Sequence, residues 1–221
     1  MDRSPAKAAL AVLNNALWCD AVCRAHVCRT EWGESLWRCL DNPPSFYPHA
    51  ITLVPNALLD GGLPVVIKDS FADLDFTSSG YEVMFDAEWI WAEPSVAAQV
   101  FAWSRVVNAP DLIEWERAWR GSPSDFIQFP SAMLNDPGVA FMAVREEGKI
   151  AGGCVLNASP PVVGLSNVFG TMDGLWGDLC AAASLVFSGM AVVGYEDGES
   201  LLGALEAGFE SVGPLRVLVR K

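Results

Sequence analysis

The chain has 221 residues, with 14 Lys and Arg against 27 Asp and Glu, which gives a formal net charge of −13. Because phosphate and anionic lipid surfaces need clustered cations, this acidic chain without a basic stretch is not expected to bind nucleic acid or a membrane surface. With 52% hydrophobic and 19% charged residues, it has the composition of a well-packed globular protein and not of a disordered one.

The first half of the chain is expected to begin with a long helix. Ser4 followed by Pro5 is typical of a helix start, and apolar residues then recur at helical spacing as far as His26. A second short helix is expected over residues 30–40, because Asn42-Pro43-Pro44 would end it. The following segments predict short strands or loops at 47–59 and 63–68, and a strand at 81–91.

The second half alternates strands and helices. The pattern predicts a strand at 101–107, a helix from Pro110 to Gly121, a hairpin of 139–145 and 150–157, a strand at 162–169, a helix at 177–187, a strand at 190–195, a helix at 200–207 and a strand at 214–220. The only seam lies near Glu93-Pro94. We therefore expect an N-terminal extension or small domain at 1–98 and a second domain at 99–221.

The longest run without charge, Leu179 to Tyr195, is too short and too interrupted for a membrane span. Ser188-Gly189 divides it, so a buried helix followed by a strand is expected. The N-terminus lacks the pattern of a signal peptide, and six cysteines in a chain of this length do not form a disulfide framework. These features predict a cytoplasmic protein with reduced thiols.

The order of elements from about residue 100 to 221 resembles the GNAT superfamily, the GCN5-related N-acyltransferases. The likeness is carried by the hairpin at 140–153, the strand at 165–169 and the closing helix and Gly-Phe turn at 204–213. The resemblance implies an α/β (α+β) fold in which helices flank a mixed, mainly antiparallel sheet. Residues 1–98 would then be a helical and strand extension.

The resemblance also implies a function, which is transfer of an acyl group from acetyl-CoA or another acyl-CoA to a small amine-bearing acceptor. In this family the central strand offers backbone groups to the thioester, and the following loop offers backbone amides to the CoA pyrophosphate at a helix start. The matching positions here are Asn167, Val168 and Phe169 for the strand and Gly174 and Gly177 for the loop.

Two departures from the family pattern keep other functions open. Asp173 and Asp178 occupy the loop where the family usually has a cation, and Ala204 stands where it often has a catalytic tyrosine. A negative charge repels pyrophosphate. The alternatives are a GNAT-fold binding or interaction protein that has lost CoA binding and catalysis, and an enzyme that uses the cleft for other chemistry.

Tyr195 and Glu196 are the candidate catalytic residues, because they end a predicted buried strand on the expected cofactor side. Tyr195 would act as a displaced general acid with the carboxylate assisting. The alternative is an ordinary polar strand end before the turn at Asp197-Gly198.

Glu82, Asp86 and Glu88 are the candidate substrate-binding residues. Their even spacing would place them on one face of a strand, where three carboxylates could bind a cationic amine. The alternative is a solvated outer face. With the acidic balance of the chain, this pattern favours a cationic or neutral small-molecule acceptor.

Cys19, Cys23 and His26 share one face of the first predicted helix, a spacing that suits a core stripe as well as a metal site. We expect no metal site there. The chain also has 9 tryptophans, for which we expect core burial, inter-subunit burial in a homodimer, or a place along a cleft.

Overall fold

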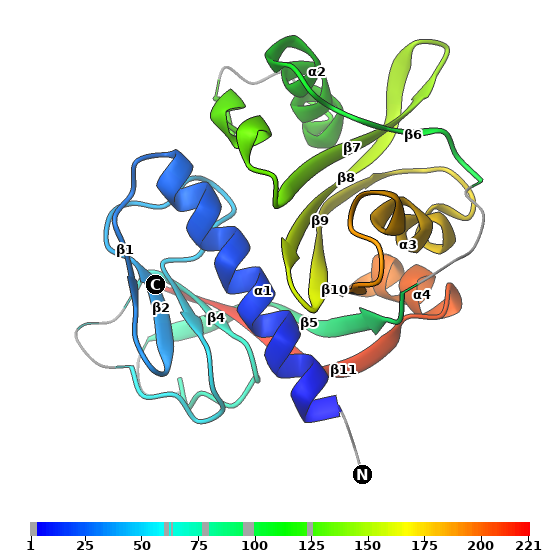
Figure 1. Cartoon of the computed structure of the whole chain (residues 1–221). Helices are drawn as coiled ribbons and strands as arrows, with labels where there is room; N and C mark the ends of the chain where they lie inside the picture. The colour runs from blue at the N-terminus through cyan, green and yellow to red at the C-terminus, as the bar shows by residue number, and fades with distance from the viewer. Residues whose placement is uncertain (1–3, 60–61, 63, 77–79, 95–99, 123–125) are drawn as a thin grey trace.

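Eleven strands form one sheet in the part of the chain that the computed structural model describes, residues 4–59, 62, 64–76, 80–94, 100–122 and 126–221 (Figure 1). The spatial order is β1-β2-β3-β4-β11-β5-β10-β9-β8-β7-β6. The strands are β1 Thr30–Trp32, β2 Leu36–Cys39, β3 Ala50–Thr52, β4 Val66–Asp69, β5 Tyr81–Ala92, β6 Trp103–Arg105, β7 Val139–Glu146, β8 Lys149–Ser159, β9 Val162–Gly170, β10 Ala191–Glu196 and β11 Glu210–Arg220.

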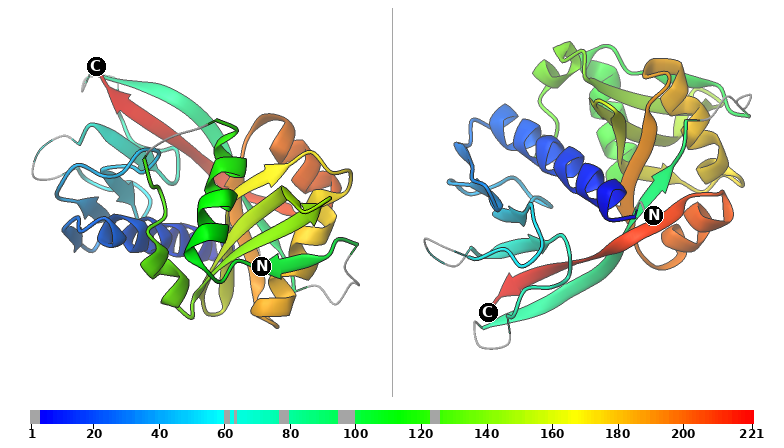
Figure 2. Two further views of the ribbon diagram at one scale, coloured as in Figure 1. Left: turned by 90° about the horizontal axis from the view of Figure 1, so that it is seen from above. Right: turned by 60° about the horizontal axis from the view of Figure 1, so that its bottom comes forward.

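Helices cover both faces of this sheet. They are α1 Ser4–Ala25, α2 Ala109–Arg120, α3 Leu175–Val186 and α4 Gly198–Glu206, with the 3-10 helix η1 at Ser131–Asn135. Buried side chains of α1 and α2 pack on one face, and those of α3 and α4 pack on the other. Figure 2 shows α1 lying along the sheet on the side opposite α3 and α4. Among the described residues, no helix is long and apolar enough to cross a membrane.

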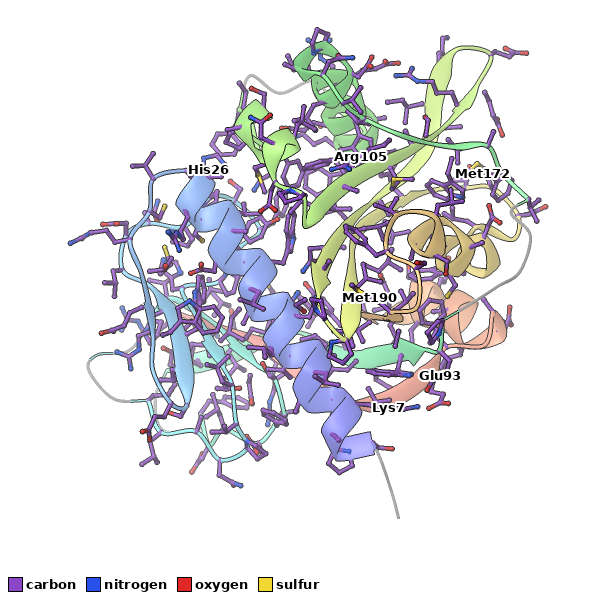
Figure 3. The ribbon with its side chains drawn as sticks, viewed as in Figure 1. Lys7, His26, Glu93, Arg105, Met172 and Met190 are labelled. Atoms are coloured by element: carbon purple, nitrogen blue, oxygen red, sulfur yellow. The ribbon has the colours of Figure 1, made fainter. Side chains whose placement is uncertain are left out.

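The expected fold class is confirmed. The pairs β3–β4 and β9–β10 are parallel and the other described pairs are antiparallel, so the sheet is mixed and mainly antiparallel. The long first helix is also confirmed. Near its start, Lys7 makes ion pairs with Glu93 at 3.4 Å and Glu210 at 2.8 Å, which tie α1 to the ends of β5 and β11 (Figure 3).

The helix predicted at residues 30–40 is wrong, because this segment forms the β1–β2 hairpin. Trp32 pairs directly with Trp37 across the hairpin, so both rings lie on the same face. Both indole N–H groups donate to the Asp20 carboxylate on α1, at 3.2 and 2.8 Å. In a helix, residues five apart do not share a face. A tertiary contact with α1 therefore overrides the local helical pattern.

The division expected at residues 98 and 99 lies outside the described residues. On either side of it, the two parts of the chain share the sheet. β5 from the first half lies between β10 and β11 of the second half and is antiparallel to both. Strand β11 follows α4 in the chain, but β5 of the first half separates it from β10 in the sheet.

Candidate functional site

The central strands β9 and β10 separate partway along their length. They pair in parallel from Val162 with Ala191 to Gly164 with Val193. At the next position a Cβ on Gly194 would lie 2.9 Å from the Leu165 carbonyl oxygen, so the closest approach requires a glycine. Beyond that point no ladder pair joins the two strands among the described residues, and a gap opens between them.

A β-bulge on β9 lies at the start of this gap. Val155 of β8 pairs with Ser166 and Gly153 pairs with Phe169, so Asn167 and Val168 together oppose one residue of β8. Asn167 has a left-handed backbone with φ 53°, which Asn tolerates better than most residues. A bulge takes backbone groups out of the ladder. This region is therefore able to offer backbone hydrogen bonds to a ligand.

A cavity of about 240 Å³ occupies the gap. It is lined by Leu165, Ser166, Asn167 and Val168 of β9, Tyr195 and Glu196 of β10, Asn15, Trp18 and Cys19 of α1, and Phe46, Tyr47 and Lys68. The structure thus brings Asn167, Val168, Tyr195 and Glu196 together. Phe169 instead packs against Trp115, with ring centroids 5.1 Å apart.

Glu196 lies at one side of this cavity and is partly buried. Burial, with a smaller contribution from the charge of Asp197, raises the pKa of the Glu196 carboxyl to about 8. A carboxyl with such a pKa can gain and lose a proton near neutral pH. This is the property expected of a general base in a cleft.

The raised pKa of Glu196 predicts how stability depends on pH. The carboxyl is neutral in both states below its ordinary pKa of 4.5, whereas at intermediate pH unfolding releases its proton. Stability is therefore lost as pH rises from 4.5 to about 8. Glu196→Gln should match the parent near pH 4.5 and exceed it at pH 9 by at least about 1 kcal/mol, or about 2–4 °C in Tm. Thermal unfolding at both pH values tests this, and the same Tm difference at the two pH values would contradict it.

Tyr195 belongs to the opposite face of β10, because side chains alternate along a strand. Its ring meets Trp89 edge to face at 5.6 Å. Lys68 Nζ lies 4.1 Å from the centre of the same ring and donates a hydrogen bond of 2.7 Å to Asn15 Oδ1. The cavity reaches both Tyr195 and Glu196 because it passes through the gap between the strands.

A second, more apolar cavity of about 410 Å³ adjoins the first. It shares Phe46, Tyr47, Lys68 and Tyr195 with the first cavity and is otherwise lined by Pro48, Val66, Met84, Phe85 and Val217. Sequence reasoning missed Lys68, Asn15 and Tyr47. The one available signal was a lysine within the apolar strand Val66–Asp69.

The N-terminus of α3 follows β9 and is preceded by Gly174, which has a left-handed backbone with φ 79°. Gly177 in the first turn is exposed, and nothing lies within 4 Å of the position of a Cβ there. The first backbone N–H groups of a helix lack intrahelical partners and favour anions. Open backbone at a helix start fits a pyrophosphate, although Asp173 is exposed nearby.

Asp178 does not face this opening. The residue is 2% exposed, and its carboxylate accepts hydrogen bonds from Val100 N, Phe101 N and Trp103 Nε1 at 2.7, 2.9 and 2.8 Å. The negative charge is therefore turned inward and fully hydrogen-bonded. The expectation that Asp178 would oppose a pyrophosphate is corrected by this arrangement, whereas Asp173 remains at the surface.

Comparison with known proteins supports one fold. No family model matches the chain, and no curated protein matches it. A GCN5-related N-acetyltransferase from Kribbella flavida superposes with a TM-score of 0.60 at 12% identity, covering 93% of this chain and 95% of that one. A protein assigned to the GNAT family from Novosphingobium aromaticivorans gives 0.58 at 14% identity, covering 95% and 99%. The chain has the GNAT fold.

The GNAT likeness extends over the first half of the chain as well as the second, since these superpositions cover more than nine tenths of it. The gap between β9 and β10, the bulge and the start of α3 all lie within this fold. At such low identity the comparison establishes the fold and leaves the chemistry to the residues of the site.

The prediction that Glu82, Asp86 and Glu88 share one face is wrong. Around Met84 a bulge shifts the register, so that Val83 pairs with Leu218 and Phe85 with Val217. Glu82 therefore faces the same side as Phe85 and away from Asp86. Glu82 makes an ion pair of 2.7 Å with Lys221, and none of the three carboxylates lines either cavity. Their role in substrate binding stays a prediction.

The two cysteines of the predicted stripe pack in the core, and His26 follows the last residue of α1 and is partly buried. Cys19 and Cys23 are buried, and His26 at the end of the helix (Figure 3) lies 2.8 Å from the Gln128 carbonyl oxygen through Nε2. Within the described ranges, no group of three or more His, Cys, Asp or Glu is arranged to hold a metal ion. Most of the tryptophans are buried, and Trp18 lines the first cavity.

Proposed function

We propose that this protein is an acyl-CoA-dependent N-acyltransferase that acts on a small amine-bearing acceptor. The observation that carries the proposal is the cavity between β9 and β10. On one side it has the bulged backbone at Asn167 and Val168, and on the other it has a carboxyl whose pKa is about 8. This arrangement combines a place for an acyl carbonyl with a group that can accept a proton.

The bulge would position the acyl group. Backbone N–H groups released from the ladder near Asn167 would hydrogen-bond the thioester carbonyl and stabilise the negative charge that develops on its oxygen. Such donors need no particular side chain and cost little reorganisation because the strand holds them in place. The absence of a family tyrosine at Ala204 does not affect this contribution.

Glu196 would act on the acceptor amine. An amine attacks only after it loses a proton, and a carboxyl with a pKa of about 8 is ionised, and so able to accept that proton, at alkaline pH. As the new C–N bond forms and the C–S bond breaks, Glu196 would take the proton from nitrogen. Tyr195 would supply a proton to the departing sulfur.

The start of α3 would hold the pyrophosphate of CoA through backbone amides near Gly174 and Gly177. Both glycines are exposed, and the backbone at Gly177 is open to close approach. The helix dipole favours an anion here. Because Asp178 is turned inward, Asp173 is the acidic side chain of the loop that remains exposed.

Binding of acetyl-CoA is the direct test. At 100 times its dissociation constant a ligand stabilises the folded state by about 2.7 kcal/mol, which corresponds to several degrees in Tm. Gly177→Ala sharpens the test, because alanine in an exposed helical position should raise the stability of the free protein by up to about 1 kcal/mol. The added methyl should nevertheless crowd the pyrophosphate and reduce the acetyl-CoA response.

Thermal unfolding and calorimetry with the parent and with Gly177→Ala, each with and without acetyl-CoA, give both readouts. A free variant that is more stable but responds less to the ligand is expected. No response of the parent at millimolar acetyl-CoA would contradict the proposal and leave a GNAT-fold binding protein or other chemistry in the cleft. An equal response in both proteins would remove α3 as the pyrophosphate site.

A further inference from the structure

Lys68 is buried, and no described residue forms an ion pair with it. Only 4% of its surface is exposed to solvent, and its Nζ donates to Asn15 Oδ1 and lies over the Tyr195 ring. None of the ion pairs formed by described residues includes Lys68. A lysine has three N–H donors, and lysine is rarely this buried unless it is paired. Lys68 therefore keeps donors for an anion in the cavities that it lines.

Tyr47 supplies a second donor beside the same cavities. Its hydroxyl is buried, and its proton has no acceptor among the described residues. The indole of Trp18 lies nearby but can only donate, so the hydroxyl proton stays available. Burial raises the pKa of Tyr47 well above its ordinary value, which keeps that proton in place. A buried hydroxyl whose proton has no acceptor is costly unless a ligand supplies one.

The space next to these two donors is apolar. The cavity of about 410 Å³ is bounded by Val66, Met84, Phe85 and Val217 in addition to Lys68 and Tyr47. A ligand that places an anionic group at the donors would therefore have an apolar part in this cavity. The first cavity continues from the same residues to Glu196 and the β9 bulge.

We infer that the acceptor is an amino carboxylate with an apolar side chain, its carboxylate bound by Lys68 and Tyr47. The apolar side chain lies in the larger cavity, and the amine points toward the gap between β9 and β10. The acylation of this amine rests on the proposed function, whereas recognition of the carboxylate does not. Such an acceptor is a zwitterion with no net charge, so it matches the neutral acceptor that the composition favours.

Four small molecules test how much the carboxylate of the acceptor contributes to binding. L-leucine and L-phenylalanine are compared with 3-methylbutylamine and 2-phenylethylamine, which lack only the carboxylate. Calorimetry without acetyl-CoA measures affinity, and release of CoA thiol measures turnover. Because a hydrogen bond to a charged group contributes about 1.5–3 kcal/mol, we expect each amino acid to bind about tenfold to a hundredfold more tightly than its amine.

Lys68→Met should bring the affinity for the amino acids down to that for the amines and leave the amines unchanged. Tyr47→Phe, which removes one oxygen atom, should reduce the same preference about threefold to tenfold and provides the test if the lysine variant does not fold. Lys149→Met is the matched control, because Lys149 is exposed on the β7–β8 hairpin and lines neither cavity. It should retain the full preference.

The inference is overturned if the amines bind as tightly as the amino acids, or if folded Lys68→Met and Tyr47→Phe both keep the preference. It is also overturned if Lys68→Met weakens acetyl-CoA and spares the amino acids. Stabilisation by acetyl-CoA without binding of any amino acid refutes this inference alone. Binding of amino acids that depends on Lys68, with no response to acetyl-CoA, supports the carboxylate site and refutes the proposed acyl transfer.

Discussion

Gly164→Ala is expected to lower the free energy of unfolding by at least about 3 kcal/mol, because it adds a methyl where two buried amides meet. A Cβ at Gly164 would overlap Asn14 Oδ1 and Asn157 Oδ1. These two side chains join α1 to β8. Asn14 Nδ2 donates to the Asn157 carbonyl oxygen at 3.0 Å, and Asn157 Nδ2 donates back to Asn14 Oδ1 at 3.2 Å.

The large cost follows from what the methyl displaces. Either the two amides separate and leave buried donors and acceptors unpaired, or α1 moves away from the sheet. Asn15, the next residue on α1, holds Lys68. A displaced helix would therefore also disturb the cavity that we assign to the acceptor.

Urea unfolding of Gly164→Ala measures this cost, and Asn14→Ala alone and in combination with it supplies the control. Asn14→Ala removes one of the two obstructing groups, so the double variant should lose less stability than the sum of the two single losses. A loss below about 1 kcal/mol in Gly164→Ala, or strict additivity, would show that the amide pair does not fill the space over Gly164.

Asp178→Ala is expected to cost about 3–5 kcal/mol, since three hydrogen bonds to a charged acceptor, one of them from the buried Trp103 indole, would be lost at once. The donors are two backbone N–H groups, of Val100 and Phe101, and the indole N–H of Trp103. They lie in the segment that leads into β6, so Asp178 joins the start of α3 to the far edge of the sheet.

Asp173→Ala is the matched control for this prediction. Asp173 lies in the turn just before α3 and is exposed, so its removal should change stability by no more than about 0.5 kcal/mol. Chemical denaturation of both variants makes the comparison. Equal effects of the two substitutions would contradict the view that Asp178 is a structural acceptor and Asp173 a surface charge.

The order of elements in the second half was readable from the sequence because it depends on neighbouring residues. The helix at 109–120 begins after the Asn108 cap and ends at Gly121, which has a left-handed backbone with φ 66°. Turn residues and hydrophobic spacing identify such limits without knowledge of the rest of the chain. The same reasoning located the β7–β8 hairpin and the strand that carries the bulge.

Local pattern failed where a distant partner decided the outcome. Residues 30–40 form a hairpin because Trp32 and Trp37 both reach Asp20 on α1. The face occupied by Glu82 was misassigned because even spacing assumes a regular strand, and the bulge near Met84 changes the parity. A bulge depends on the pairing strand as well as on the strand that contains it, so spacing alone does not reveal it.

For the same reason, the sequence predicted only some of the residues that line the candidate site. Asn167, Val168, Tyr195 and Glu196 belong to the strands that carry the GNAT resemblance, and they do line the cavity. Asn15, Tyr47 and Lys68 come from the first half of the chain, for which the sequence suggested no family pattern. Asn15 reaches the site on α1, which packs across β8, β9, β10 and β11, and Lys68 reaches it on β4, which pairs with β11 and places the lysine against Asn15.

By itself the sequence determined the acidic globular character, most of the elements and the GNAT-like order, since these depend on composition and on residues near one another in the chain. The tertiary structure alone decided which charges matter. It turned Asp178 inward against three donors and buried Lys68 without a carboxylate partner among the described residues. Burial and hydrogen-bond partners arise from contacts between distant segments, and the effect of a charge depends on those contacts.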